Sequence, residues 1–346
     1  MNSTLIDTLT DAGQPVEMWT SPDGSTVLVL PYGGRILGLI APGCKRNFFW
    51  THPAMESADS LRNYYQSGEW HNSGGDRTWL SPEIDFFLPH FPKLETYVQP
   101  HELDPGNYRL THENGHITLT NRFALELSRS QHTVDIEISK RLRAAKNPLR
   151  HSECADRLMY AGFTLRTLLE FTNRHVDPVQ IGLWSLLQLP HGGELLIPTF
   201  SRSTATPYFG HVNESDLLIT EHLVRYKMRS EGSHKLGFQP SVVTGRVGYL
   251  YPDGVDSCLV VRNFSVNPSG EYLDVPCSST CSIGSAIEGC SVNGELGKFS
   301  ELEYHTPAIG GPAGDFVCED ESQLWAFRGM ERDIREAARI LLSSEI

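Results

Sequence analysis

The sequence lacks a long apolar run and has little positive charge. A membrane-spanning helix needs roughly 20 consecutive apolar residues, and the 346 residues contain no such run. Lys and Arg together number 29 against 42 Asp and Glu, which gives a formal net charge of −13. Because a surface of this sign repels phosphate backbones, we expect no nucleic-acid partner, and the missing apolar run predicts no membrane span.

Cysteines are few and form no recognisable metal or redox pattern. The chain has seven, an odd number, and the closest pair is Cys277 and Cys281 in the stretch CSSTC. Zinc sites and redox pairs use spacings such as CxxC instead. The first residues, MNSTLIDTLTDAG, also lack the basic start and apolar centre of a secretory signal. We therefore expect reduced thiols and a cytoplasmic protein.

Common catalytic motifs are absent too, including the GxSxG elbow and the glycine-rich phosphate loops. Residues 112–116, HENGH, do match the HExxH pattern of zinc proteases. That pattern binds a metal only on a helix, where both histidines share one face. Here Asn114-Gly115 is a strong signal for a two-residue hairpin turn. We therefore predict a hairpin, and we expect neither a metal nor a cofactor.

What the sequence does contain is a two-residue alternation of apolar and polar side chains. The alternating stretches are short and are separated by turn residues, which is typical of β-strands. The 30 Gly and 21 Pro are spread along the chain. We predict strands at residues 26–30, 35–40, 116–120, 133–139, 257–264 and 299–304, and we assign the longer apolar stretches 157–173 and 179–189 to strands as well.

The end of the chain is different. Residues 330–344 have Ile334, Ala337, Ala338 and Leu341 on one helical face, which predicts an amphipathic helix. No repeat or flexible linker divides the rest. The sequence therefore predicts an all-β protein in which residues 1–346 form one domain, with two facing sheets and a short C-terminal helix.

The stretch HNSGGDRTWLSPE, residues 71–83, is the first candidate for a ligand site. We interpret it as a polar loop in which Asn72, Asp76 and Arg77 offer hydrogen bonds and Trp79 offers a flat apolar face. Sugars need this mixture, because their hydroxyls bind polar groups while their C–H face packs on an aromatic ring. The alternative is a structural turn held by an Asp-Arg ion pair, with the tryptophan in the core. The paired glycines would allow a close backbone approach.

A second candidate lies in residues 179–189. As a strand, this stretch would place Trp184 and Gln188 on one face. A tryptophan among leucines is more often a core residue.

The third candidate is the stretch FSELEYHTPA. In a strand, Glu301, Glu303 and His305 are two residues apart and point to the same side. Two carboxylates and an imidazole could supply a general acid and a general base, and their mutual repulsion would raise the pKa of one carboxyl group. The alternative is a charged strand face in solvent.

These stretches, in this order, resemble the galactose mutarotase (aldose 1-epimerase) superfamily. YGGRILGLIAP is similar to the opening G-G-R-I strand of that family, and residues 71–79 lie where it has a His-Gly-Gly loop ending in tryptophan. PVQIGLWSLLQL matches its P-V-N-L-T-N-H-S-Y-F-N-L strand without a gap, and SELEY falls at its E-T-Q strand. The GGDRxWxxPE stretch is closer still to uncharacterised bacterial relatives. The resemblance implies a large antiparallel β-supersandwich with a carbohydrate site on one sheet.

The resemblance also implies roles. Mutarotases open the sugar ring with a glutamate base and a histidine acid, and this glutamate falls on Glu301. The histidine falls on Trp184, which cannot exchange a proton at neutral pH, so we expect His71 or His305 to act as the acid. The expected site consists of the catalytic residues Glu301, His71 and His305 and the substrate-binding residues Asn72, Asp76, Arg77, Trp79, Glu83, Trp184, Gln188 and Glu303.

Two functions remain open at this point. The first is an aldose 1-epimerase-like isomerase, and the second is a sugar-binding protein without catalysis, in which Trp184 stacks on the ring. A lyase or hydrolase is a weaker third option, because carboxylates two apart on one strand are poorly placed to flank a glycosidic bond. In each case the partner is a small-molecule sugar or sugar derivative.

Overall fold

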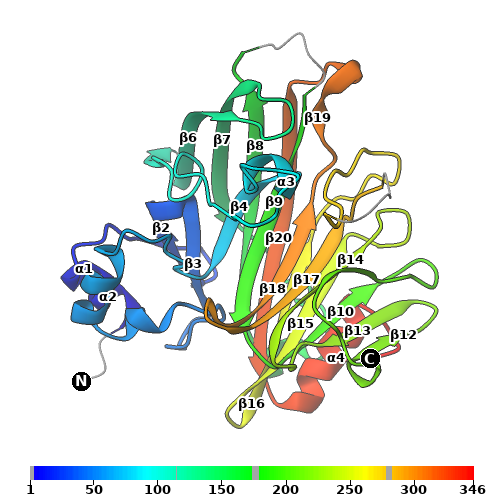
Figure 1. The fold of residues 1–346 in the computed structure, drawn as a ribbon. Coiled ribbons are helices and arrows are strands. Elements are labelled where there is room, and N and C mark those ends of the chain that lie inside the picture. The colour runs from blue at the N-terminus through cyan, green and yellow to red at the C-terminus, as the bar shows by residue number, and fades with distance from the viewer. Residues whose placement is uncertain (1–3, 114, 174–178, 278–282) are drawn as a thin grey trace.

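The computed structural model describes residues 4–113, 115–173, 179–277 and 283–346. Its strands form two antiparallel sheets (Figure 1). The first sheet contains, in spatial order, β1 (Glu17–Thr20), β2 (Thr26–Leu30), β3 (Arg35–Ile40), β4 (Asp76–Ser81), β9 (Gln180–Pro190), β18 (Gly297–His305), β17 (Ile287–Gly294), β14 (Gly232–Phe238) and β11 (Thr206–Phe209), with β19 (Ile309–Gly310) paired to β9.

The second sheet is also antiparallel. Its order is β12 (Leu217–Ile219), β13 (Leu223–Lys227), β10 (Glu194–Pro198), β15 (Arg246–Asp253), β16 (Asp256–Asn263), β20 (Val317–Gly329), β8 (Met159–Phe171), β7 (Thr133–Ala144), β6 (His116–Glu126) and β5 (Arg109–Glu113). The predicted strands are confirmed, including the two long apolar stretches, which form β8 and β9. The predicted fold class is therefore confirmed.

The HENGH stretch is a hairpin and not a helix. Strands β5 and β6 pair antiparallel, with Glu113 opposite His116. Asn114, at the predicted turn, lies outside the described residues. Since no helix forms here, His112 and His116 lack the shared helical face that the zinc motif requires.

The main core lies between the two sheets. Leu187 of β9 and Leu302 of β18 face inward and join Val260 of β16 and Ala326 of β20 in one buried cluster. Alternate residues of β9 and β18 therefore point to the opposite, outer face of the first sheet. Strand β9 is buried on both faces, since residues 181–189 are all buried, which explains its continuous apolar character.

Helices cover parts of both outer faces. Helix α4 (Glu331–Leu341) packs on β16 and β20 through the predicted apolar residues, and this confirms the C-terminal helix (Figure 1). Helices α1 (Leu5–Asp11) and α2 (Ala58–Tyr65) share a small core with β2 and β3. The short helix α3 (Glu83–Phe86) follows β4 directly. Among the described residues, no helix is both long enough and apolar enough to span a membrane.

The interpretation of residues 71–83 as a polar loop is wrong for its second half. Residues 76–81 form β4, which pairs with β3 and β9 inside the first sheet. Arg77 is only 3 % exposed and Asp76 is fully buried. The charged side chains are tolerated there because each has an oppositely charged partner.

The two glycines of this stretch serve the backbone packing. Gly74 and Gly75 have φ values of +93° and +73°. A Cβ on Gly75 would lie 2.4 Å from the carbonyl oxygen of Ile36, and one on Gly74 would lie 2.4 Å from that of Trp50. Their small size therefore lets residues 71–75 lie against neighbouring backbone, which fixes the start of β4.

Candidate functional site

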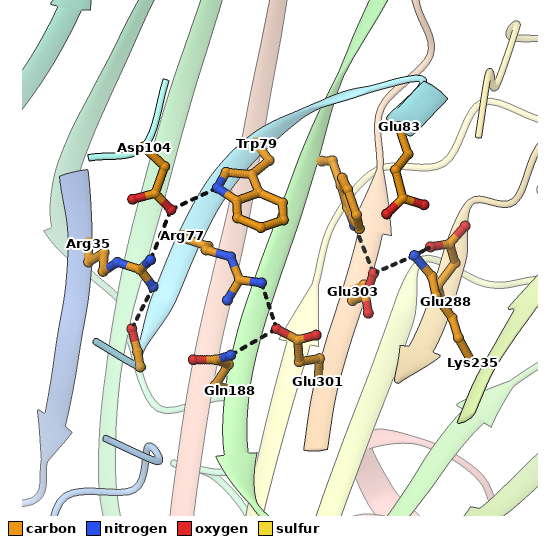
Figure 2. Close-up of polar contacts among 12 residues, drawn as sticks. Arg35, Arg77, Trp79, Glu83, Asp104, Gln188, Lys235, Glu288, Glu301 and Glu303 are labelled. Carbon is orange, nitrogen blue, oxygen red and sulfur yellow. Dashed lines mark hydrogen bonds and ion pairs between the residues drawn. The ribbon is translucent and has the colours of Figure 1, made fainter. Parts of the chain in front are cut away.

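The outer face of the first sheet carries the candidate site. Strand register aligns Arg77 with Leu186 of β9, Leu186 with Glu303 of β18, and Glu303 with Glu288 of β17. Strand alternation therefore places the polar residues of four neighbouring strands on one face. Figure 2 shows them as a continuous row of side chains.

Glu301 is held from two sides. Its Oε1 atom lies 2.8 Å from Nη2 of Arg77 and accepts a hydrogen bond from Nε2 of Gln188 at 3.0 Å (Figure 2). All three side chains are buried. Both contacts use Oε1, which leaves Oε2 of Glu301 to accept a proton or hydrogen bond from a ligand.

Glu303 lies two residues further along β18, on the same face of the strand as Glu301. Its Oε2 atom accepts a 2.8 Å hydrogen bond from the indole Nε1 of Trp184 and lies 3.3 Å from Nζ of Lys235. Burial, followed by the charges of Glu301 and Glu288, raises the pKa of Glu303 to about 8. Lys235 and the Trp184 hydrogen bond act in the opposite direction but do not cancel this rise.

A further buried carboxylate, that of Glu288, lies on β17 opposite Glu303. Glu288 is fully buried, and its Oε2 lies 2.6 Å from Nζ of Lys235 and 3.3 Å from Nε2 of His305. Burial opposes its charge, but Lys235 and then His305 outweigh burial and lower the pKa of Glu288. Burial likewise opposes the charge of Lys235, yet Glu288 and Glu303 raise its pKa well above the usual value. The lysine is therefore a fixed cation of this site.

Among the residues that the structure describes, two groups of side chains have metal-ligand chemistry. They are Asp274, Glu288 and His305, and Cys290, Glu301 and Glu303; within each group the candidate atoms lie within 4.8 Å of one another. A side-chain cation already pairs with a carboxylate of each group. Lys235 pairs with Glu288 of the first group, and Arg77 pairs with Glu301 of the second. We therefore assign no metal to either group.

A pocket of about 240 Å³ opens over these residues. This is smaller than the roughly 300–1,000 Å³ of sites for drug-sized ligands and suits a ligand of about one sugar ring. Three tryptophans give it flat apolar walls. It is lined by Trp70, Asn72, Arg77, Trp79, Glu83, Tyr97, Gln99, Trp184, Leu186, Gln188, Phe209, Ser233, Lys235, Cys290, Val292, Leu296, Phe299, Glu301 and Glu303.

Several polar atoms of the pocket residues have unused hydrogen-bonding capacity. Within the described part of the chain, Oδ1 of Asn72, Nε and Nη1 of Arg77 and Oε1 of Gln188 are buried without a hydrogen-bond partner. A buried polar group without a partner costs free energy, about 1–3 kcal/mol. Because neighbouring protein atoms cover these atoms, a hydroxyl group of a ligand would reach them only after the side chains shift toward the pocket.

Seven of the predicted substrate-binding residues and one predicted catalytic residue line this pocket. Glu83 does so from the start of α3, where its Oε1 accepts a hydrogen bond from the hydroxyl of Tyr97 at 2.8 Å. Trp79 also lines the pocket. Its Nε1 donates a hydrogen bond to Asp104, and Asp104 forms an ion pair with Arg35 (Figure 2). The residues brought together are Asn72, Arg77, Trp79, Glu83, Trp184, Gln188, Glu301 and Glu303.

Asp76 lies on the other side of the sheet. It forms a 2.6 Å ion pair with Arg262 of β16 between the two sheets, where both side chains are fully buried. Adjacent residues of a strand point to opposite faces, so Asp76 and Arg77 cannot act together on one ligand. The ion pair between Asp76 and Arg77 considered from the sequence therefore does not form: Asp76 pairs with Arg262 and Arg77 pairs with Glu301.

Neither predicted histidine lines the pocket. His71 lies among Tyr32, Tyr64 and Tyr65, and its two ring nitrogens contact the hydroxyls of Tyr32 and Ser67 at 2.5 and 3.0 Å. Burial lowers the pKa of His71.

His305 lies on the predicted face of β18, but it is fully buried. Its ring stacks on Trp184 at a centroid distance of 5.5 Å. The tryptophan thus borders the pocket while the histidine does not.

Sequence reasoning missed Lys235, Glu288 and Trp70. The ammonium of Lys235 lies 4.4 Å from the centre of the Trp184 ring, and the guanidinium of Arg77 lies 5.8 Å from that of Trp70. Both arrangements are favourable cation–π contacts. The two-residue alternation within GSHKLGF and within IEGCSVNG could have indicated the strand face on which Lys235 and Glu288 each lie. It could not have indicated which strands lie beside β18.

Solved structures with a similar fold include two bacterial proteins. One is a galactose mutarotase-like protein from Lactobacillus casei ATCC 334, with 7% identity and a TM-score of 0.53, covering 90% of this chain and 100% of that one. The other is a protein from Synechocystis sp. PCC 6803, with 11% identity and a TM-score of 0.51, covering 92% and 96%. At these identities the likeness shows the fold alone, which is galactose mutarotase-like, as the sequence resemblance implied.

Comparison with protein families gives one assignment. A search of proteins with curated descriptions finds no match. A family model described as "Family of unknown function (DUF6786)" matches residues 4–343. Because this match spans the two sheets and the helices that cover them, the chain belongs to the DUF6786 family.

Proposed function

We propose that this protein binds a neutral aldose in the pocket of the first sheet and interconverts its two anomers. The observation that carries the proposal is the pocket of about 240 Å³, which is walled by tryptophans and lined by the polar side chains of Asn72, Arg77 and Gln188. Hydroxyls of a sugar would pair with these side chains, and its C–H face would pack on an indole ring. The galactose mutarotase-like fold supports this choice by analogy.

Glu301 is the base in this proposal. Arg77 and Gln188 fix its carboxylate through Oε1, so that Oε2 can take the proton of the anomeric hydroxyl. Ring opening then gives the aldehyde, and rotation about the adjacent C–C bond before closure gives the other anomer. A positioned general base contributes about 10²–10⁴-fold to such a rate.

The charges around the pocket favour a neutral substrate. Arg77 and Lys235, the two cations that line it, are both paired with carboxylates. Glu83 adds a further carboxyl group at the pocket wall. A sugar phosphate or uronate would place a new negative charge among these carboxylates, at a cost in a site of low dielectric constant.

A sugar-binding protein without catalysis is the second candidate. The observation that favours it is the lack of an imidazole among the residues lining the pocket, taken over the described part of the chain. In this case Trp184 and the polar side chains that line the pocket would bind the sugar without changing it.

One panel of sugars separates the two candidates. Thermal unfolding and polarimetry should be measured with neutral hexoses, pentoses and 6-deoxy sugars, and with the 6-phosphate and uronate of each hexose. We expect a neutral aldose to raise the melting temperature and its mutarotation to be accelerated, with the charged analogues much weaker. Binding without acceleration would identify a binding protein, and binding of charged analogues alone would contradict the proposed substrate class.

A further inference from the structure

Anomer interconversion requires an acid as well as a base, and the structure leaves few groups for that role. Both ring nitrogens of His71 are engaged by hydroxyl groups, and His305 lies beneath Trp184. Besides Glu301, the residues lining the pocket that can hold a titratable proton are Glu83, Tyr97, Lys235, Cys290 and Glu303. Burial first raises the pKa of Tyr97 and of Cys290 well above the usual values, so both are weak acids at neutral pH. Glu83 lies on α3, outside the group formed by Cys290, Glu301 and Glu303. Lys235 is fixed as a cation by two carboxylates.

Glu303 has the right position relative to the base. A carboxylate oxygen of Glu303 lies within 4.8 Å of one of Glu301. The anomeric hydroxyl and the ring oxygen of an aldose are bonded to the same carbon. A proton acceptor and a proton donor separated as these two carboxyl groups are can therefore reach these two atoms at the same time.

The charges around Glu303 explain how it can hold a proton. Lys235 is shared between Glu288 at 2.6 Å and Glu303 at 3.3 Å, and the shorter contact is to Glu288. One ammonium cannot neutralise two fully buried carboxylates. The ionisable groups around this network come from several elements. They are Arg77 of β4, Glu83 of α3, Tyr97, Tyr208 of β11, Lys235 of β14, Asp274 in the segment before β17, Glu288 and Cys290 of β17, and Glu301 and His305 of β18.

Carboxyl groups outnumber cations in this set, so a proton on one carboxyl group relieves the repulsion. Burial and then Glu288 raise the pKa of Asp274 well above its usual value, and burial followed by Glu301 and Glu288 raises the pKa of Glu303 to about 8. Of these two carboxyl groups only Glu303 lines the pocket. Its proton is then present at neutral pH beside Glu301, which pairs with Arg77.

We infer that Glu303 is the acid that protonates the ring oxygen during ring opening, an inference that rests on the isomerase function proposed above. Glu301 removes the proton of the anomeric hydroxyl while the bond between the anomeric carbon and the ring oxygen breaks. The electron pair of that bond goes to the ring oxygen, which takes the proton of Glu303. The products are the open-chain aldehyde, protonated Glu301 and ionised Glu303.

Ring closure reverses every transfer. After rotation about the C–C bond, Glu303 takes back the proton of the chain hydroxyl as that oxygen attacks the aldehyde, and Glu301 returns its proton to the carbonyl oxygen. Trp184 and Lys235 contact Oε2 of Glu303, and both stabilise the carboxylate that exists between the two steps. No oxidant, metal or cofactor is needed for this balance.

The test compares Glu303→Gln with the wild type and with Glu319→Gln, a substitution of an exposed carboxylate on β20 of the other sheet. We expect Glu303→Gln to lower kcat by about 10²–10⁴-fold while the sugar still raises the melting temperature. The kcat of the wild type should fall as the pH rises above about 8, because Glu303 then loses its proton. The residual rate of Glu303→Gln should show no such fall.

A second readout does not depend on turnover. Infrared difference spectra between pH 6 and pH 10 should show a protonated carboxyl band in the wild type and in Glu319→Gln. In Glu303→Gln this band should be weaker by one carboxyl group, while any contribution of Asp274, whose pKa is also raised by burial, remains. A full rate in Glu303→Gln, or an ionised Glu303 at pH 6, would overturn the acid role and leave the isomerase function standing. A wild type that binds sugar without turnover would overturn the isomerase function and the acid role together, whatever the infrared band shows.

Discussion

Trp184 is the residue at which this chain departs most clearly from the mutarotase pattern. Its indole Nε1 donates to Glu303, and its ring contacts both the imidazole of His305 and the ammonium of Lys235. The position that the resemblance assigns to an acid therefore holds a hydrogen-bond donor. That donor acts on the carboxyl group to which we assign the acid role.

This contact makes a prediction about pH. The hydrogen bond from Trp184 lowers the pKa of Glu303 because it favours the charged carboxylate. Trp184→Phe keeps an aromatic ring but removes the donor, so the pKa of Glu303 should rise. The fall of kcat at alkaline pH should move to higher pH by about one unit, as measured from pH–rate profiles.

Trp70→Phe is the matched control. Trp70 also lines the pocket, but within the described residues its Nε1 is buried without a hydrogen-bond partner. Its substitution should leave the midpoint of the alkaline fall in place, whatever it does to affinity. A midpoint that stays unchanged or moves to lower pH in Trp184→Phe would show that the tryptophan does not act on Glu303.

Single residues were predictable where local alternation decides their direction. Period two alone placed Glu301 and Glu303 on one face of their strand and Trp184 and Gln188 on one face of theirs, and all four line the pocket. Lys235 could not be predicted, because its role depends on β14 lying next to β17, a pairing between distant parts of the chain.

At the scale of elements, β4 is decisive because it brings Arg77 to Glu301. The strand begins immediately after Gly75, whose carbonyl oxygen accepts a hydrogen bond from the backbone N–H of Gln188. The sequence suggested a surface loop because it is polar. Only the tertiary partners, Glu301 of β18 on one face and Arg262 of the second sheet on the other, show why charged residues can form a central strand.

Gly75→Ala tests the anchoring of this strand. Gly254, in the hairpin between β15 and β16, has a similar φ of +70° but no atom within 4 Å of an added Cβ. Both substitutions carry the left-handed strain of about 1–2 kcal/mol. Gly75→Ala should cost about 1–3 kcal/mol more, because its Cβ would lie 2.4 Å from the oxygen of Ile36.

Urea unfolding of the two variants measures this difference. We also expect Gly75→Ala to weaken sugar binding, since a shift of β4 moves Arg77 away from Glu301. Equal losses of stability in the two variants would mean that the close approach at Gly75 is easily relieved.

At the scale of the whole molecule, the two sheets divide the polar residues into an inner and an outer set. Asp76, Arg262 and Lys140 are buried between the sheets, whereas the pocket residues face away from the second sheet. Burial lowers the pKa of Lys140 to about 8. The inner set stabilises the stacking of the sheets through ion pairs and hydrogen bonds, and the outer set is available to a ligand.

The architecture was more predictable than the site. Alternation and turn residues predicted strands, and the order of four motifs predicted the sandwich. The segment between β4 and β5 that closes the pocket with Tyr97 and Gln99 has no periodic pattern. Its contribution depends on tertiary contacts, such as the stacking of Tyr97 on Phe87, that no local signal encodes.

The central claim is that Glu301, on the outer face of the first sheet, catalyses anomer exchange. Two-dimensional exchange NMR of the α and β anomeric signals of the tightest-binding neutral aldose tests it most directly. We predict exchange cross-peaks with the wild type and with Glu319→Gln, and a rate reduced by about 10²–10⁴-fold with Glu301→Gln at saturating sugar. Exchange at the wild-type rate in Glu301→Gln, or at the uncatalysed rate in the sugar-bound wild type, would contradict it.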